Sequence, residues 1–165
     1  IDTLTNIANE FSNFAQMPKA KEQNIELSAV IEDAIQIFSL ESDVEMTFTT
    51  QTEHTNITAD KDQILRVFNN LLKNAIQAIP VDRKGEISIY LKEYNGMVKV
   101  EIQDNGSGVP EEIQENIFIP NFTTKSKGMG LGLAMVKNII ENHGGEIWFK
   151  TKKDEGTTFY LTFKV

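Results

Sequence analysis

Apolar residues spaced three and four apart predict several amphipathic helices along the chain. The predicted helices cover residues 1–18, 28–39 and about 60–79, then a stretch from Met129 or Gly130 to 143, with a short one opened by Pro110. Ser28 is the expected N-cap of the second helix, and Asp60 or Asp62 opens the longest one. Gly144-Gly145 stops the last helix.

Alternation of apolar and polar residues predicts strands between these helices. The two clearest strands, 86–94 and 97–104, are joined at Asn95-Gly96, which is a strong hairpin signal. The other predicted strands lie at 24–27, 44–50, 55–58, 146–151 and 157–163. Helices mixed with hairpins favour an α+β fold. We expect a two-layer α/β sandwich, in which one mostly antiparallel, mixed sheet is covered by about three helices on one face.

The composition is that of one globular domain with its own core. The 165 residues are 40% hydrophobic and 24% charged, and no apolar run approaches the ~18 residues that a membrane span needs. The net charge of −8 argues against a nucleic-acid surface. The chain has no cysteine, which excludes disulfides and fits a cytoplasmic location.

The first predicted helix carries a near-heptad apolar seam. It begins at Ile1 in the middle of the pattern and ends by Pro18, and the next stretch offers no partner helix. We interpret the chain as a fragment of a longer protein and expect the partner helix to lie outside it. Packing of this helix on the domain itself is the alternative.

The longest helix presents the first candidate site. Its predicted apolar face consists of Ile64, Phe68, Leu71, Leu72, Ala75 and Ile79. Asn70 and Asn74 lie about 40° apart on the opposite side, with Lys73 near them. Asparagine is a poor choice for an exposed helix surface, whereas its carbonyl oxygen can ligate a hard cation such as magnesium. An ordinary solvated face is the alternative.

The acid that ends the strand 97–104 is the second candidate. Asp104 has the parity of the apolar residues in this strand, so it should point to the covered side of the sheet. A carboxylate there is costly unless it is paired or hydrogen-bonded. Gly106 and Gly108 follow, where the backbone can lie close to a ligand. The alternative is a common turn whose acid caps the helix opened by Pro110.

The third candidate is a glycine-rich stretch, "TTKSKGMGLGLAMV" at 123–136. Gly128, Gly130 and Gly132 precede a helix and would expose N–H groups to an anion, with Lys125 as a local cation. This pattern predicts a phosphate cradle under a mobile lid, and a flexible glycine hinge is the alternative.

Thr157 on the last strand also has the parity of the covered face, although an ordinary β-branched strand residue would look the same. The three candidates come from separate segments, and each turns polar groups or glycines toward the covered side. Together they predict a nucleotide pocket between helix and sheet.

Five stretches then follow one another in the order and spacing of a known domain. They are "NNLLKNAIQAI", "DNGSGVP", "IFIPNFTTK", "GMGLGLAMVKNII" and "GTTFYLTF". They resemble the asparagine box, first glycine box, phenylalanine box, second glycine box and closing strand of sensor histidine kinases, in the GHKL superfamily (gyrase, Hsp90, histidine kinase, MutL). The resemblance covers about residues 24–165. It implies the Bergerat ATP-binding fold, with ATP and Mg²⁺ as cofactors.

The resemblance also implies a role for each candidate residue. Asn74 would coordinate Mg²⁺, and Asn70 and Lys73 would complete the catalytic set. Asp104 would accept the exocyclic amine of adenine, and Thr157 would support Asp104 through water. The implied nucleotide contacts are Asn70, Lys73, Asn74, Asp104, Gly106, Gly108, Val109, Phe122, Thr124, Lys125, Gly128, Met129, Gly130, Leu131, Gly132, Leu133 and Thr157.

The first helix resembles the end of the second helix in a dimerisation and histidine-phosphotransfer bundle, and "NEFSNFAQMP" is typical of the NtrB/NtrY branch. The implied domains are this helix at 1–18, a linker at 19–23 and the ATP-binding domain at 24–165. Neither His54 nor His143 resembles the accepting histidine, which would lie outside this chain. The implied partners are the chain's own bundle within a homodimer, and the receiver domain of a response regulator.

Asn70 stands where the ATP-hydrolysing members of the superfamily carry a glutamate that activates water. Transfer of the γ-phosphoryl group to a protein side chain is therefore favoured over hydrolysis. The alternatives are a GHKL ATPase module, a docking domain whose pocket has decayed, and a serine kinase resembling anti-sigma factors. The domain is expected in the cytoplasm, from a parent protein that could be anchored in the inner membrane.

Overall fold

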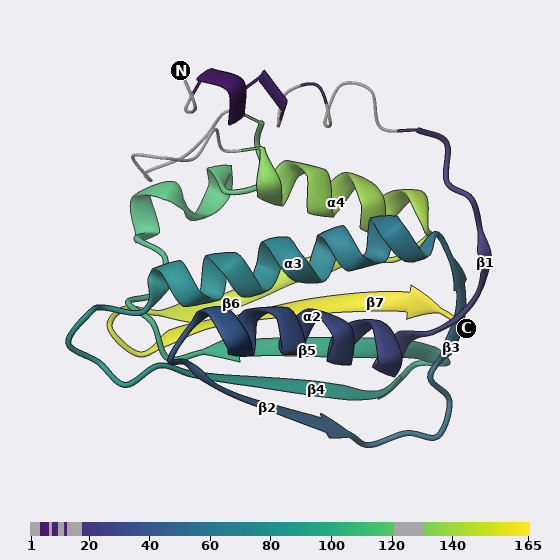
Figure 1. Ribbon diagram of the computed structural model, residues 1–165, viewed down its shortest axis with the longest axis horizontal. Coiled ribbons are helices and arrows are strands. Elements are labelled where there is room, and N and C mark those ends of the chain that lie inside the picture. The colour runs from purple at the N-terminus through teal and green to yellow at the C-terminus, as the bar shows by residue number, and fades with distance from the viewer. Residues whose placement is uncertain (1–3, 7, 10–11, 13–17, 121–130) are drawn as a thin grey trace.

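The computed structural model describes residues 4–6, 8–9, 12, 18–120 and 131–165 (Figure 1). Within these residues, five strands form one sheet in the order β2-β4-β5-β7-β6. The strands are β2 (Glu45–Thr50), β4 (Glu86–Tyr94), β5 (Met97–Asp104), β6 (Ile147–Lys152) and β7 (Gly156–Lys164). Neighbouring strands are antiparallel except β2 and β4, which run parallel. The mostly antiparallel, mixed sheet predicted from the sequence is therefore confirmed.

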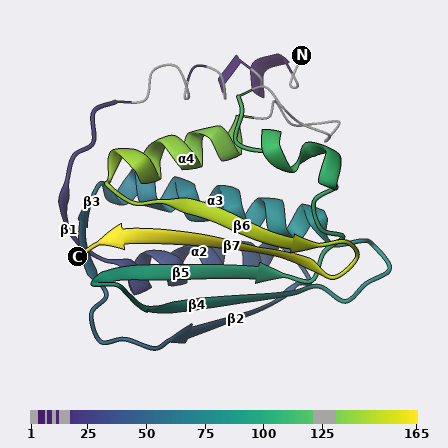
Figure 2. The same cartoon turned by 180° about the vertical axis from the view of Figure 1, so that it is seen from behind.

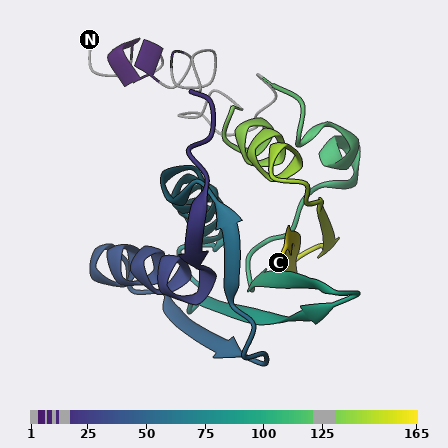
Figure 3. The ribbon, with the colours of Figure 1, turned by 90° about the vertical axis from the view of Figure 1, so that its right-hand side faces the viewer.

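Three helices in the described part of the chain cover one face of this sheet. They are α2 (Leu27–Glu41), α3 (Lys61–Ala78) and α4 (Gly132–Asn142). Helix α2 packs by β2, α3 lies on β5 and β7, and α4 lies on β6 and β7. Figure 2 shows the sheet in front of the helices, and Figure 3 shows the two layers from the side. The predicted two-layer sandwich is confirmed.

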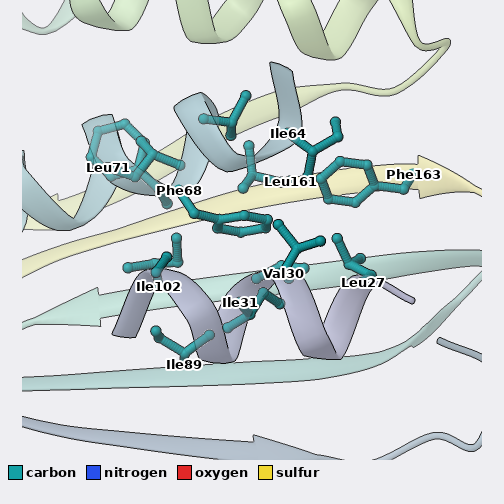
Figure 4. Packing of buried hydrophobic residues seen from close by; sticks show 14 of the residues in the cluster. Leu27, Val30, Ile31, Ile64, Phe68, Leu71, Ile89, Ile102, Leu161 and Phe163 are labelled. Atoms are coloured by element: carbon teal, nitrogen blue, oxygen red, sulfur yellow. The ribbon is translucent and has the colours of Figure 1, made fainter. Parts of the chain in front are cut away.

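The hydrophobic core fills the space between the two layers (Figure 4). Phe68 of α3 and Phe163 of β7 are both buried in it, with ring centroids 6.3 Å apart. The buried face of α3 includes Ile64, Phe68, Leu71, Leu72 and Ala75, as predicted from the sequence. Ile79, predicted for the same face, is instead the C-cap of α3 and is half-buried. Burying one such large side chain contributes about 1.5–3 kcal/mol. This packing fixes which face of α3 remains for polar residues.

A second, two-stranded sheet joins β1 (Gln23–Glu26) to β3 (Asn56–Ala59) in antiparallel pairing. The sequence predicted both strands but not that they would form a sheet of their own. Strand pairing depends on backbone partners that are distant in the chain, so the local pattern could not show it. The pairing brings the residues before β1 beside the start of α3.

The helix starts confirm one prediction and correct two others. Helix α4 begins at Gly132, with Leu131 as its N-cap, and not at Met129 or Gly130 as predicted. Asp60 is the N-cap of α3, and its side chain accepts the N–H groups of Asp62 and Gln63. Helix α2 begins at Leu27 with Glu26 as its N-cap, so the prediction that Ser28 is the cap is wrong. The Ser28 hydroxyl, within the first turn, instead donates a hydrogen bond of 3.0 Å to the carboxylate of Glu26.

The remaining turns and helix ends lie where the sequence predicted them. Asn95 (φ 51°) and Gly96 (φ 75°) both adopt left-handed backbone, as a type I′ hairpin requires. The short helix after Pro110 is the 3₁₀ helix η1 (Glu111–Asn116), and Gly144 (φ 76°) ends α4.

The N-terminal region is described only in part. Residues 4–6, 8–9 and 12 are helical, and the rest of the predicted first helix lies outside the described residues. No helix in the described ranges is long and apolar enough to cross a membrane.

Candidate functional site

Asp104 is the last residue of β5 and lies on the helix-covered side of the sheet, only 6% exposed. Its Oδ1 accepts the backbone N–H of Gly106 at 2.9 Å and that of Thr157 at 3.2 Å. Among the described residues, no group donates to Oδ2. Burial raises the pKa of the Asp104 carboxyl above its ordinary value, and the two N–H groups offset only part of this effect. The carboxyl therefore keeps one acceptor oxygen for a donor from elsewhere.

The turn that follows Asp104 is not a helix cap. Helix η1, which Pro110 precedes, has no side-chain hydrogen bond at its N-cap. The bond from Gly106 to Oδ1 closes a local turn around the carboxyl instead. The alternative in which the acid serves the short helix is therefore excluded.

Thr157 is buried beside Asp104, and a second threonine supports it. The hydroxyl oxygens of Thr157 and Thr151 lie 2.9 Å apart. Thr151 Oγ1 also donates to the carbonyl of Gly156 at 3.1 Å and accepts the N–H of Val109 at 2.9 Å. Thr151 thus joins the β6–β7 hairpin to the loop after β5. The sequence analysis missed it, because a single threonine on a strand looks like any β-branched residue.

Gly106 and Gly108 allow close backbone contacts. A Cβ on Gly106 would stand 2.7 Å from the carbonyl oxygen of Ala78, at the end of α3. Gly108 has a left-handed φ of 80°, and its Cβ would stand 2.6 Å from the carbonyl oxygen of Lys152. The loop is therefore held between α3 and the β6–β7 hairpin. On the side where each side chain would project, the neighbour is protein backbone.

Asn70 and Asn74 are half-buried on the face of α3 that is turned away from the core, and Lys73 is exposed. The Asn70 amide nitrogen donates to the carbonyl of Arg66 at 2.8 Å. This bond directs Asn70 Oδ1 toward the start of α4. A Cβ on Gly132 would lie 2.8 Å from that oxygen. Asn70, predicted to lie beside the magnesium ligand Asn74, and Gly132, predicted to bind phosphate, are thus brought together.

The second half of α3 contacts both the loop after Asp104 and the start of α4. Ser107, in the loop after Asp104, donates its N–H to the carbonyl of Ala78 at 2.9 Å. Ala78 lies four residues after Asn74 on the same helix. The C-terminal end of α3 therefore contacts the Asp104 loop, while Asn70, about two turns earlier, contacts the start of α4.

Asn69 is a further candidate that the sequence analysis did not single out. Its Oδ1 is buried and has no hydrogen-bond partner within the described ranges. An unpaired buried polar atom costs roughly 1–3 kcal/mol. The available signal was the Asn-Asn pair itself, since asparagine is unfavourable inside a helix.

The phosphate side of the predicted site is described only in part. The predicted residues that lie outside the described ranges are Phe122, Thr124, Lys125, Gly128, Met129 and Gly130. Beyond them, buried Leu131 precedes α4, and Gly132 and Leu133 open it. Before them, Phe118 packs edge-on against Phe149, with ring centroids 6.0 Å apart.

This fold and arrangement agree with a known family. Residues 59–165 match the family described as histidine kinase-, DNA gyrase B-, and HSP90-like ATPase. The match covers well over half of the chain, so the chain belongs to this family.

Among individual proteins, the chain is similar to the sensor histidine kinase ZraS of Klebsiella oxytoca. The two are 37% identical over 166 residues, which cover 97% of this chain and 36% of that protein. It is also 34% identical to a protein of Rickettsia prowazekii named as an NtrY-like sensor histidine kinase, over 97% of this chain and 27% of that protein. The chain thus spans only 36% and 27% of the length of these two relatives.

Solved structures give the same result. The catalytic domain of histidine kinase ThkA superposes with a TM-score of 0.78 at 32% identity, over 87% of this chain and 95% of that one. ThkA has also been solved in complex with the response regulator protein TrrA. That match has a TM-score of 0.80 at 27% identity and covers 98% of this chain and 48% of that one.

Proposed function

We propose that this chain is the catalytic ATP-binding part of a sensor histidine kinase. It binds Mg-ATP and transfers the γ-phosphoryl group to a histidine on a dimerisation bundle, for relay to an aspartate of a response regulator. The observation that carries the proposal is Asp104, a buried carboxyl whose Oδ2 is left without a donor by the described residues. Membership of an ATPase family supports the choice of nucleotide.

In this proposal Oδ2 of Asp104 accepts the exocyclic amine of adenine, which is a hydrogen-bond donor. The N–H groups of Gly106 and Thr157 hold Oδ1, which presets the direction of Oδ2. A hydrogen bond to an ionised carboxylate is roughly twice as strong as a neutral one. The amine therefore offsets part of the cost of burying this carboxyl. We assign Gly106, Gly108 and Val109 to the base side through their backbone, since the positions where the two glycines would carry a Cβ face Ala78 and Lys152. Thr151 fastens this loop through the N–H of Val109.

Asn74 holds the magnesium ion, and Asn70 stands one turn earlier on the same face of α3. Side-chain carbonyl oxygens are hard ligands, and Mg²⁺ commonly takes one or two protein ligands together with substrate phosphates. The N-terminus of α4 suits the phosphates, because its first N–H groups have no partner within the helix. Asn70 Oδ1 points at that terminus, at Gly132. Lys73, exposed nearby, supplies positive charge.

The residue at position 70 favours transfer over hydrolysis. An amide oxygen is not basic at neutral pH, so Asn70 cannot take a proton from water as a carboxylate can. Its amide nitrogen is moreover engaged by the carbonyl of Arg66. Bound ATP supplies the phosphoryl group, and the protein contributes binding, charge neutralisation and orientation.

The partners follow from the same proposal. Residues 1–18 are the end of a bundle helix, 19–23 a linker whose last residue already belongs to β1, and 24–165 the ATP-binding domain. The phosphoryl acceptor is the bundle of a homodimer, and the downstream partner is a receiver domain. Support comes from relatives that are named sensor histidine kinases and from the ThkA–TrrA complex. We place the domain in the cytoplasm, without nucleic-acid or membrane contact.

Calorimetry with Mg-ATP tests the adenine contact. Asp104→Asn should weaken binding at least about tenfold, since the carboxylate acceptor is lost. Asp154→Asn is the matched control. Asp154 is exposed in the β6–β7 turn at φ 61°, which asparagine adopts readily, so its affinity should equal that of the wild type. Equal affinity of Asp104→Asn and wild type would disprove the adenine assignment.

A transfer assay tests the chemistry. The chain and labelled ATP are mixed with a separately supplied bundle that carries the accepting histidine. Acid-labile label should appear on the bundle and not on this chain, and Asn74→Ala should abolish it. ATP turnover at the same rate without the bundle would instead support an ATPase.

A further inference from the structure

The stretch that leads into the domain is held on α3 by two hydrogen bonds. The N–H of Lys21 donates to Asp60 Oδ2 at 2.8 Å, and the Gln63 side-chain amide donates to the carbonyl of Pro18 at 3.1 Å. Asp60 and Gln63 are 9% and 6% exposed. Strand β1 follows directly and pairs with β3, whose last residue precedes Asp60. The chain therefore enters the domain beside the first turn of α3.

The two oxygens of the Asp60 carboxylate have different tasks. Oδ1 caps α3 by accepting the N–H groups of Asp62 and Gln63 at 3.0 and 3.2 Å, while Oδ2 binds Lys21. Burial acts to raise the pKa of Asp60. The three N–H groups outweigh burial and hold that pKa below its ordinary value. Because the tasks are separate, the bond to Lys21 can be removed while the cap is kept.

The start of α3 is also fastened to the end of α4. The N–H of Asp60 donates to His143 Nε2 at 3.2 Å, so Nδ1 carries the ring proton and donates to the carbonyl of Ile139 at 2.7 Å. Further along, Asn70 of α3 meets Gly132 at the start of α4. The two antiparallel helices are thus connected at points roughly 15 Å apart along α3. This arrangement favours movement of α3 and α4 as one body.

We propose that Asp60 and Gln63 form a latch that fixes residues 18–21 on α3, so that displacement of the preceding segment is transmitted to the face of α3 that carries Asn70 and Asn74. The two latch residues are positioning residues, since they lie at the opposite end of α3 from the Asp104 loop. The regulatory consequence rests on the proposed function, because it assumes that this face binds Mg-ATP. By linkage, the latch and the nucleotide then influence each other by the same factor.

Amide hydrogen exchange in the 165-residue chain tests the latch without any ligand. Asp60→Asn keeps a carbonyl oxygen for the cap but places an amide N–H₂ group where Lys21 donates. Exchange at the Lys21 amide should become at least about tenfold faster, as expected for loss of a hydrogen bond to a charged acceptor. Exchange at the Asn74 amide should rise at least about twofold, because loss of the bond to Lys21 removes a restraint that residues 18–21 place on α3. Gln63→Met, which removes the bond to Pro18, should act in the same direction.

Asp62→Asn is the matched control, because it makes the same chemical change at an exposed carboxylate in the same turn. It should leave both exchange rates at their wild-type values. Unchanged exchange at Lys21 in Asp60→Asn would overturn the latch, and a change at Lys21 without one at Asn74 would overturn transmission.

A second arm adds Mg-ATP. Saturation should alter Lys21 exchange in the wild type and in Asp62→Asn, but not in Asp60→Asn, which should still bind the nucleotide. An equal response in Asp60→Asn would overturn the coupling. Failure of the wild type to bind Mg-ATP would instead contradict the proposed function and leave the ligand-free result on the latch standing.

Discussion

Asn70 Oδ1 lies 2.8 Å from the position that a Cβ on Gly132 would take, so the side chain of one helix occupies the space left by the first residue of the next. The amide is held in this direction by its bond to the carbonyl of Arg66. Two residues separated by more than sixty positions therefore share one contact at the start of α4. The contact makes the orientation of Asn70 sensitive to any side chain at position 132.

Gly132→Ala should weaken Mg-ATP binding without weakening the fold. The added methyl group would displace the Asn70 amide, while Gly132 has no left-handed φ, so alanine adopts its backbone without strain. Calorimetry with Mg-ATP and urea unfolding of the same variant would measure the two effects separately. The double variant with Asn70→Ala supplies the control. If displacement of Asn70 is the cause, Gly132→Ala should cost no further affinity in that background, and a second full loss would refute this account.

Asp104→Asn should make the ligand-free protein more stable at neutral pH. Burial raises the pKa of Asp104 in the folded state, so the folded protein binds more protons than the unfolded one between about pH 3.9 and that raised pKa. Wild-type stability therefore falls as the pH rises through this window, and the full cost persists above it. Asparagine keeps a carbonyl oxygen for Gly106 and Thr157 but carries no charge.

Urea unfolding of wild type and Asp104→Asn at several pH values between 4 and 7 measures this effect. The stability advantage of the variant should be largest at pH 7 and shrink toward pH 4. An advantage that did not change with pH would show that ionisation of this carboxyl is not its cause.

Thr151→Val should destabilise the protein by roughly 1–3 kcal/mol, because the N–H of Val109 and the hydroxyl of Thr157 would lose their shared partner. Thr151→Ser keeps the hydroxyl and loses one methyl group, so it should cost only about 0.8 kcal/mol. Urea unfolding compares the two variants. A larger loss for serine than for valine would mean that packing of the methyl group, rather than the hydroxyl, matters at this position.

Gly106→Ala should cost about 1–3 kcal/mol or more, since its Cβ would press on the backbone carbonyl of Ala78, which has little freedom to move. Gly96→Asn is the comparison. Gly96 has a left-handed φ of 75° that asparagine tolerates, and its Cβ would meet no atom within 4 Å. Thermal unfolding should separate the two variants clearly, and equal midpoints would contradict the steric argument.

Much of the fold could be predicted because the signals are local. The alternation in 97–104 predicted both the strand and the inward direction of Asp104, since side chains on a strand alternate between its faces. Asn95-Gly96 predicted a turn because both residues tolerate left-handed backbone. The start of α2 was misplaced, because several residues near Ser28 suit a helix start equally well and Leu27 is drawn into the helix by its burial.

Features of the candidate site could be predicted only where the sequence pattern within one segment indicated them. Thr151 was missed because its hydroxyl acts on Val109 and Thr157, residues of other segments. The contact between Asp60 and Lys21 spans 39 positions, and no periodic pattern marks it. Such contacts depend on the way the elements pack, which the pattern within each element does not contain.

The sequence by itself determined the helices, the strands, the buried faces and the polar residues at their edges, because backbone preference and hydrophobic periodicity act over neighbouring residues. Only the tertiary structure decided that β1 and β3 form a sheet of their own, that Asn70 fits against Gly132, and that Asp60 joins the entering chain to α3 and α4. These relationships arise when the two layers close on their core, since packing then brings together groups that are far apart in the chain and fixes which donors and acceptors meet.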